Sequence, residues 1–166
     1  QNQGLEFELG FRIIDGKDWK WNVNANGAYN INKIIELPNN GLERNRQNAF
    51  QVYTGKGEDK VWVGGYQEGQ RPGDIYAFKA EGIYKSVNEI PGELIDKSTG
   101  NNGSNNKPLY GPDAWARLTD AQKTKALPIQ PGDVKWKDVN GDGTIDNFYL
   151  VKVGNTVPKW TGGINT

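Results

Sequence analysis

The stretch "LEFELGFRII", Leu5–Ile14, alternates between two faces of an extended strand. One face carries Leu5, Phe7, Leu9, Phe11 and Ile13, and the other carries Glu6, Glu8, Gly10 and Arg12. An Asp-Gly turn signal follows, and "WKWNVNANGAYNIN", Trp19–Asn32, alternates again, with apolar or small side chains opposite lysine and asparagine. The two stretches predict an antiparallel hairpin with one apolar face.

Two kinds of protein contain such a hairpin. In a soluble β-sandwich, the apolar face would cover a core. In an outer-membrane barrel, strands of about 9–11 residues expose that face to lipid, and aromatic side chains mark the two membrane interfaces. Trp19 and Trp21 lie near one end of the apolar face and Tyr29 near the other. The alternation itself leaves both interpretations open.

The composition of the 166 residues excludes several kinds of chemistry. The chain has no cysteine and no histidine, so thiolate zinc sites, cysteine nucleophiles and Ser-His-Asp catalysis are impossible within it. No pair of carboxylates indicates a hydrolase, and we expect no catalytic and no cofactor-binding residue. Lys plus Arg equal Asp plus Glu at 20 each, which gives no long-range attraction for nucleic acid.

The lack of methionine, with a start at "QNQG", predicts a piece of a longer protein. No apolar run reaches the roughly 20 residues of a membrane-spanning helix. Ser98–Asn106, "STGNNGSNN", predicts an exposed loop, and Gly111–Pro128 is the one helical candidate, with a break near Thr119. Aromatic residues predict that ordered structure lies within residues 38–157: Trp62, Tyr66, Tyr76, Phe78, Tyr84, Trp136 and Phe148.

The segment "KDVNGDGTID", Lys137–Asp146, matches a calcium-loop pattern. The candidate ligands are the side chains of Asp138, Asn140, Asp142 and Asp146 and the backbone carbonyl of Thr144. All are hard oxygen donors, which suit a structural Ca²⁺. Position 12 holds Tyr149 where an EF-hand has glutamate, and no helix is predicted on either side. Consecutive Asn-Gly and Asp-Gly turns need no metal, so both interpretations stay open.

Several motifs occur together in an order typical of one family. "GDVKWKDVNGDGTID" is followed by "VGNTVPKWTGGIN", with Gly132, Asp133, Gly154, Asn155, Pro158, Lys159 and Trp160 at the matching positions. "VGGYQEGQRPGDIYAFKAEGIYKS" precedes them, and "NQGLEFEL" and "WKWNVNANGAYNINKI" are similar to a barrel hairpin. The chain thus resembles SusC/RagA-type TonB-linked outer-membrane transporters, although nothing in residues 93–127 carries the resemblance.

The resemblance implies a mainly β fold: antiparallel hairpins of a large outer-membrane barrel, and a long extracellular loop region with at most one short helix. Residues 1–37 would be barrel hairpin, 38–157 extracellular region with the loop at 138–146, and 158–166 the start of the next strand. The function implied is import of oligosaccharides or peptides with a SusD-like lipoprotein. TonB would contact parts of the full-length protein absent here.

The alternative function is a secreted, calcium-dependent carbohydrate-binding β-sandwich module. Surface aromatics would then hold the sugar, with Trp62, Tyr66, Tyr76 and Trp115 as candidates. An enzyme is the third hypothesis, and the absence of histidine and cysteine argues against it.

Overall fold

The structure is a computed structural model that describes residues 1–98 and 107–166. It is mainly β, as predicted. The strands are β1 (Asn2–Asp15), β2 (Lys20–Asn32), β3 (Phe50–Tyr53), β4 (Lys60–Val63), β5 (Asp74–Ala77), β6 (Ala80–Ile83), β7 (Ile95–Asp96), β8 (Leu109–Tyr110), β9 (Leu127–Pro128), β10 (Val134–Trp136), β11 (Thr144–Ile145), β12 (Val151–Asn155) and β13 (Trp160–Asn165). Residues 99–106 of the expected exposed loop lie outside the described residues, and Ser98 itself is buried.

The chain forms two compact units. The first contains Gln1–Ala49, Gly64–Ile75 and Gly154–Thr166, and the second contains Phe50–Val63 and Tyr76–Val153. The boundaries predicted at residues 37 and 157 separate barrel strands from an extracellular region, and they stay a prediction. The chain passes between the units within β5 and β12, which pair with each other.

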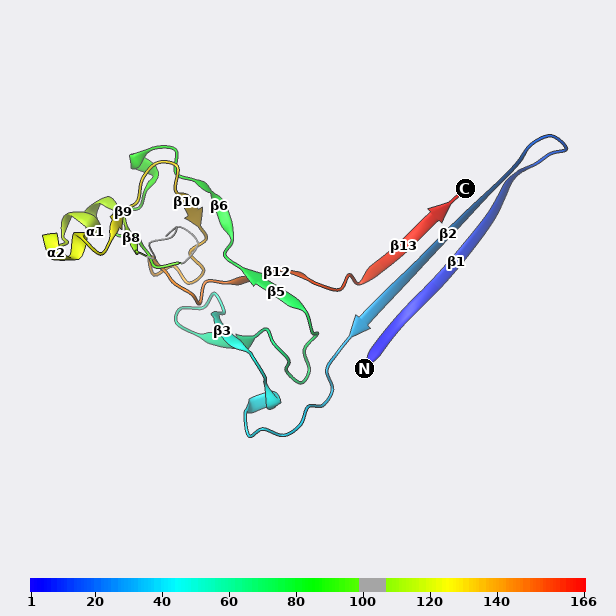
Figure 1. The fold of residues 1–166 in the computed structure, drawn as a ribbon, viewed down its shortest axis with the longest axis horizontal. Coiled ribbons are helices and arrows are strands. Elements are labelled where there is room, and N and C mark those ends of the chain that lie inside the picture. The colour runs from blue at the N-terminus through cyan, green and yellow to red at the C-terminus, as the bar shows by residue number, and fades with distance from the viewer. Residues whose placement is uncertain (99–106) are drawn as a thin grey trace. The chain divides into compact units, whose positions relative to one another are not determined.

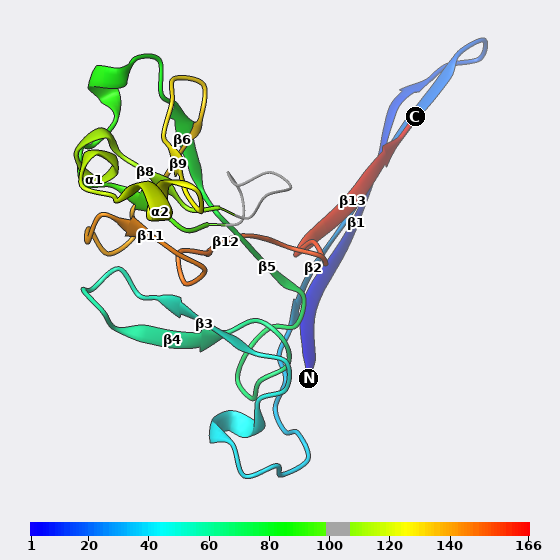
Figure 2. The ribbon, with the colours of Figure 1, turned by 60° about the vertical axis from the view of Figure 1, so that its left-hand side comes forward.

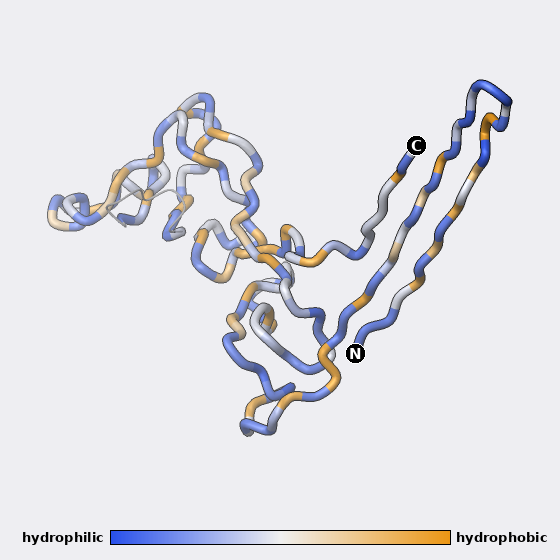
Figure 3. The backbone as a smooth tube through the Cα atoms, turned by 45° about the vertical axis from the view of Figure 1, so that its right-hand side comes forward, coloured by the Kyte–Doolittle hydropathy of each residue, from blue (hydrophilic) through white to orange (hydrophobic). Residues whose placement is uncertain are grey.

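The first unit is built on a sheet in the order β1-β2-β13 (Figures 1 and 2). Strand β2 pairs antiparallel with β1 on one edge and with β13 on the other. Tyr29 lies opposite both Leu5 and Trp160, and Ala25 lies opposite both Leu9 and Ile164. Directly opposite residues share a face of the sheet, so the apolar positions of all three strands coincide. Figure 3 shows the alternation along β1 and β2.

The alternation changes phase at a bulge near the end of β1. Arg12 pairs with Asn22, and the next pair is Ile14 with Trp21, so Ile13 is an extra residue. The prediction of strict alternation through Ile13 is therefore wrong at this point. The bulge places Ile14 opposite Trp21 and keeps the apolar face continuous to the turn.

The apolar face of this sheet is uncovered. Every residue of β1 is exposed, and the exposed fraction reaches 67% for Leu5, 62% for Trp160 and 77% for Ile164. Within the face, the Phe7 ring covers Gly27, where an added Cβ would lie 2.5 Å from Phe7 Cζ. The Tyr29 and Trp160 rings pack with centroids 4.6 Å apart. An apolar face of this extent requires another partner, because folded chains rarely leave one in water.

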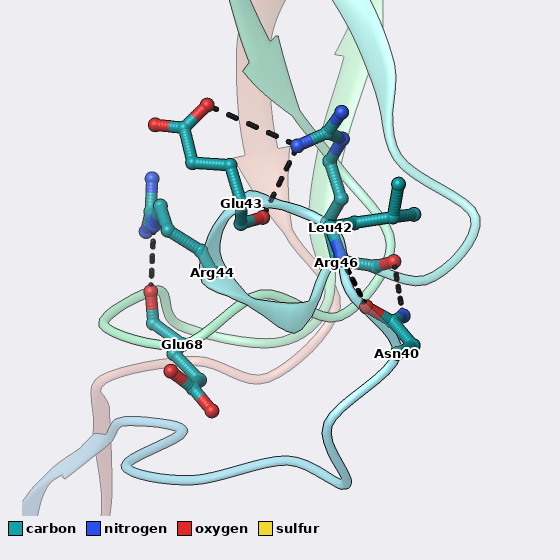
Figure 4. Close-up of polar contacts among 6 residues, drawn as sticks. All are labelled: Asn40, Leu42, Glu43, Arg44, Arg46 and Glu68. Atoms are coloured by element: carbon teal, nitrogen blue, oxygen red, sulfur yellow. Dashed lines mark hydrogen bonds and ion pairs between the residues drawn. The ribbon is translucent and has the colours of Figure 1, made fainter.

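The first unit also contains a tight polar loop around Arg44 (Figure 4). Arg44 takes a left-handed conformation with φ 57°, and its Nε donates to the Glu68 carbonyl at 2.8 Å. Asn40 Nδ2 donates to the Arg46 carbonyl at 3.0 Å, and Arg46 Nη1 donates to the Glu43 carbonyl at 3.2 Å. These bonds hold a non-glycine residue in a conformation that costs about 1 kcal/mol or more.

The second unit has its own apolar core. The buried members are Tyr53, Tyr84, Ile90, Leu94, Leu109, Ile129, Ile145 and Tyr149, with Phe78, Trp136, Val139 and Phe148 packed against them. Four of the aromatic residues named in the sequence analysis, Phe78, Tyr84, Trp136 and Phe148, lie in or against this core, whereas Tyr66 belongs to the first unit and is 52% exposed. That residues 38–157 hold the ordered structure of the isolated chain stays a prediction.

Small sheets surround this core. They are β3-β4, β10-β6 and the four-stranded β11-β7-β8-β9, in which β11-β7 and β8-β9 are parallel. The expected helical segment is present as α1 (Pro112–Ala116) and α2 (Asp120–Lys123), with short 3₁₀ turns at Glu43–Asn45 in the first unit and Val87–Glu89 in the second. The break falls at Thr119 as predicted, because Thr119 caps α2 reciprocally with Gln122. No helix in residues 1–98 and 107–166 is long and apolar enough to cross a membrane.

We predict that Ile145→Ala destabilises the second unit by about 2–5 kcal/mol, because Ile145 is 1% exposed and its loss leaves a cavity. Ile83→Ala is the matched control, since Ile83 is 56% exposed and its truncation costs less than about 0.5 kcal/mol. Urea unfolding followed by near-ultraviolet circular dichroism measures both. Equal destabilisation by the two variants would place the core elsewhere.

Candidate metal-binding loop

The predicted calcium loop joins β10 to β11 in the second unit and is fixed where it ends. The Ile95 amide donates to the Gly143 carbonyl at 2.9 Å, and the Lys97 amide donates to the Ile145 carbonyl at 2.7 Å. Ile145, within the loop, and Tyr149, three residues after its end, are buried in the core. The loop side chains therefore extend from a rigid support.

The loop consists of successive side-chain-to-backbone turns. Asp138 accepts from the Gly141 amide at 2.7 Å and, with its other oxygen, from the Gly143 amide at 2.9 Å. Asn140 Oδ1 accepts from the Asp142 amide at 3.2 Å, and Asp142 Oδ1 accepts from the Thr144 amide at 2.6 Å. Both glycines have φ near +80°, which explains why this loop needs glycine there. The expected double turn is present.

Tyr149, at the position where an EF-hand has glutamate, directs its hydroxyl group at the loop. The hydroxyl contacts Asn140 Oδ1 and lies 2.8 Å from Asp142 Oδ1. Burial raises the pKa of Tyr149 well above its ordinary value, and the hydrogen bond to Asp142 raises it further. The phenol therefore stays protonated at physiological pH and donates to oxygens that were predicted to bind a cation.

Glu58 joins the loop from the connection between β3 and β4, and no sequence motif identified it. Asn140 Nδ2 donates to Glu58 Oε1 at 3.2 Å across 82 residues of sequence. Tyr53 donates its hydroxyl to Glu58 Oε2 at 3.3 Å, and burial, with the nearby carboxylates Asp146 and Glu58, raises the pKa of Tyr53 to about 12. A carboxylate from a distant segment therefore lies beside Asn140 and Asp142.

The electrostatics at Asp142 favour its charged form. Partial desolvation opposes ionisation, but hydrogen bonds from Tyr149, Asn140 and the Thr144 amide outweigh it and lower the pKa of the carboxyl group. Asp142 is thus an anion at neutral pH, and its oxygens already accept hydrogen bonds from donors of the protein.

The structure brings together only some of the five predicted ligands. Asn140 and Asp142 are in contact, with Nδ2 donating to Oδ2 at 3.0 Å. Asp146 instead accepts from the Phe148 amide at 2.8 Å, while both oxygens of Asp138 bind backbone amides. Thr144 lies in β11. Within the described part of the chain, no three carboxylates are grouped as a metal site. Binding of Ca²⁺ by these residues stays a prediction.

Comparison with known proteins matches nearly the whole chain to a part of a much longer protein. No protein-family model matches it. It is 21% identical, over 165 residues, to the TonB-dependent receptor P3 of Formosa agariphila. The chain is similar to a segment of a TonB-dependent receptor. The matched region is 99% of this chain and 13% of the receptor, so the chain spans about an eighth of that protein.

We predict that Tyr149→Phe destabilises the second unit by about 1–2 kcal/mol, because Asn140 and Asp142 lose a buried donor while ring packing is kept. The control is Tyr84→Phe, which removes the hydroxyl group of another buried tyrosine of the same core. Thermal unfolding measures both variants. A Tyr149→Phe protein as stable as the wild type would show that the hydroxyl group does not hold the loop.

Proposed function

We propose that the chain is a segment of a SusC/RagA-type TonB-dependent transporter in the bacterial outer membrane, and that β1, β2 and β13 are consecutive strands of its barrel wall. The register of the three strands carries the proposal, because it aligns their apolar positions on one exposed face. The similarity to a TonB-dependent receptor independently supports the TonB-dependent part of the proposal, and the SusC/RagA type rests on the order of the sequence motifs alone. A lipid-facing band with aromatics near its ends is the expected outer surface of such a barrel.

The two connections of this sheet support one orientation in the proposed membrane. A turn of residues 16–19 joins β1 to β2, whereas residues 33–159 join β2 to β13. Outer-membrane barrels have short periplasmic turns and longer extracellular loops. The Asp15–Lys20 end of the hairpin therefore faces the periplasm, and the second unit belongs to an extracellular connection.

The extracellular connection would shape the substrate entrance and contact a SusD-like lipoprotein. Its folded core supports this role, because a loop with its own core presents a fixed surface. The substrate class proposed is oligosaccharides or peptides. The chain itself would bind and not catalyse, since it has no histidine or cysteine. Energy would come from TonB contacts made elsewhere in the full-length protein.

The carbohydrate-binding β-sandwich is the less supported alternative. Such a module needs two extended sheets. Among the described residues, strands longer than five residues occur only in the β1-β2-β13 sheet. The candidate aromatics Tyr76 and Trp115 are engaged within the protein. Tyr76 packs edge-on against Phe50 with centroids 5.5 Å apart, and Lys123 Nζ lies 5.7 Å from the Trp115 ring centroid.

The membrane assignment predicts opposite results for adjacent residues of β1. In the full-length protein, Leu9→Arg places a charge on the lipid face and costs about 2–4 kcal/mol of insertion free energy. Glu8→Arg, on the polar face, is tolerated. Folding into phosphatidylcholine vesicles, followed by tryptophan fluorescence, compares them. Equal tolerance of both variants would contradict a lipid-facing position for Leu9.

The lipoprotein assignment predicts that the long connection between β2 and β13 is dispensable for insertion but needed for uptake. Because β2 and β13 are antiparallel neighbours, a short Asn-Gly hairpin replaces residues 34–157 without changing their pairing. The shortened transporter should insert into membranes, bind no SusD-like lipoprotein and import no oligosaccharide or peptide. Lipoprotein binding unchanged by the replacement would place that interface elsewhere.

We also propose that the loop binds a structural Ca²⁺ with Glu58 as an added ligand. The position of Glu58 beside Asn140 and Asp142 supports this, because it supplies the carboxylate that position 12 lacks. The Tyr149 hydroxyl group competes for the same oxygens, so we expect weak binding, with a Kd of about 10⁻⁴ to 10⁻³ M.

Calorimetric titration with calcium should give a binding heat that Asp142→Ala abolishes and Glu58→Gln weakens. Glu81→Gln, on the exposed strand β6, serves as the control and should leave the heat unchanged. No heat in the wild type at millimolar calcium would leave a metal-free double turn.

A further inference from the structure

Two segments of the first unit meet where the chain leaves it and where it returns. The outgoing segment is Arg71–Asp74 and the returning segment is Gly154–Lys159. The Thr156 amide donates to the Gly73 carbonyl at 2.8 Å. Gly73 has φ +82°, and an added Cβ would lie 2.2 Å from Thr156 Oγ1. The two segments approach so closely that this position requires glycine.

The Asn155 side chain makes three hydrogen bonds, two of which join the two segments. Its Nδ2 donates to the Pro72 carbonyl at 2.9 Å and to Asp74 Oδ1 at 2.7 Å. Its Oδ1 accepts from the Val157 amide at 2.8 Å. A carbonyl on one side and an amide hydrogen on the other define which amide atom is nitrogen and which is oxygen.

Asparagine suits this position for reasons of chemistry and size. Aspartate has no hydrogen to donate and would bring a carboxylate against Asp74 and the Pro72 carbonyl. Glutamine adds a methylene group and would move the amide away from the Val157 amide. Asn155 is half-buried, as are Pro72 and Asp74, so its donors replace part of their hydration.

The returning segment then enters the sheet directly. The Lys159 carbonyl accepts from the Asn30 amide at 2.8 Å, and the next residue, Trp160, pairs with Tyr29. Arg71 Nη2 also contacts the Val157 carbonyl, between Asn155 and β13. The contacts of Asn155 are therefore five residues from the first register pair of β13.

We infer that the Asn155 side chain acts as a clasp, by which we mean its two hydrogen bonds to Pro72 and to Asp74, 81 residues away in sequence. This clasp fixes the position from which β13 pairs with β2. This assigns a physical role to two sequence motifs: Pro72-Gly73-Asp74 supplies acceptors, and Gly154-Asn155 supplies the donor. The clasp is a property of the fold and does not depend on the transport function proposed above.

Amide hydrogen exchange of the chain in detergent micelles tests the clasp. In Asn155→Asp, exchange at the Thr156 amide should accelerate roughly tenfold or more, because two hydrogen bonds are lost and two carboxylates are placed together. The Lys97 amide, in the second unit, is the internal reference. Asn165→Asp is the matched control on β13, where Asn165 is exposed, and should leave Thr156 unchanged.

The double variant Asn155→Asp/Asp74→Asn exchanges donor and acceptor across the contact and should restore part of the Thr156 protection. If Asn155→Asp unfolds the whole chain, recovery in the double variant supports the clasp, and failure to recover overturns it. Exchange at Thr156 that is the same in Asn155→Asp, Asn165→Asp and the wild type also overturns it. None of these outcomes depends on substrate uptake or on the lipoprotein.

Discussion

The pairing of β2 with β1 on one edge and β13 on the other is the constraint on which the rest of the structure depends. It places Leu5, Tyr29 and Trp160 side by side, and likewise Leu9, Ala25 and Ile164. A slip of one residue would move each of these side chains to the opposite face and mix charged residues into the apolar band. The bulge at Ile13 preserves the alignment near the turn, since it keeps Ile14 opposite Trp21. An uncovered face so consistently apolar fits lipid better than water.

The long connection from β2 to β13 carries the features that distinguish this chain from a plain hairpin. It contains a separate core and a loop whose oxygens accept from backbone amides and from Tyr149. Asn155 links the outgoing and returning segments of this connection by hydrogen bonds. The connection leaves the sheet at the end of β2 and returns at the start of β13, which pairs with β2. That arrangement lets a large folded insertion occupy a loop without disturbing the pairing of the strands on either side.

Sequence patterns predicted the features that depend on neighbouring residues. Period-two alternation gave the hairpin, and the aspartates and glycines of 138–146 gave the double turn. The break at Thr119 followed from the local sequence, because Thr119 and Gln122 cap the start of α2 reciprocally. Long-range contacts could not be predicted in this way. Glu58 reaches Asn140 across 82 residues, and Asn155 reaches Asp74 across 81. The Ile13 bulge was missed because Ile13 itself continues the alternation, and only its partner strand shows the extra residue.

Site-directed spin labelling of the full-length protein in bilayers tests most directly whether this sheet has one lipid-facing side. Single labels at residues 5–14 report collision with oxygen, which concentrates in lipid, and with a water-soluble nickel complex. A lipid-facing side predicts high oxygen accessibility at residues 5, 7, 9 and 11 and low accessibility at 6, 8, 10 and 12. It also predicts a change of phase at the bulge, so that residue 14 again faces lipid. Equal accessibility to the nickel complex at all positions, or alternation without a phase change, would contradict it.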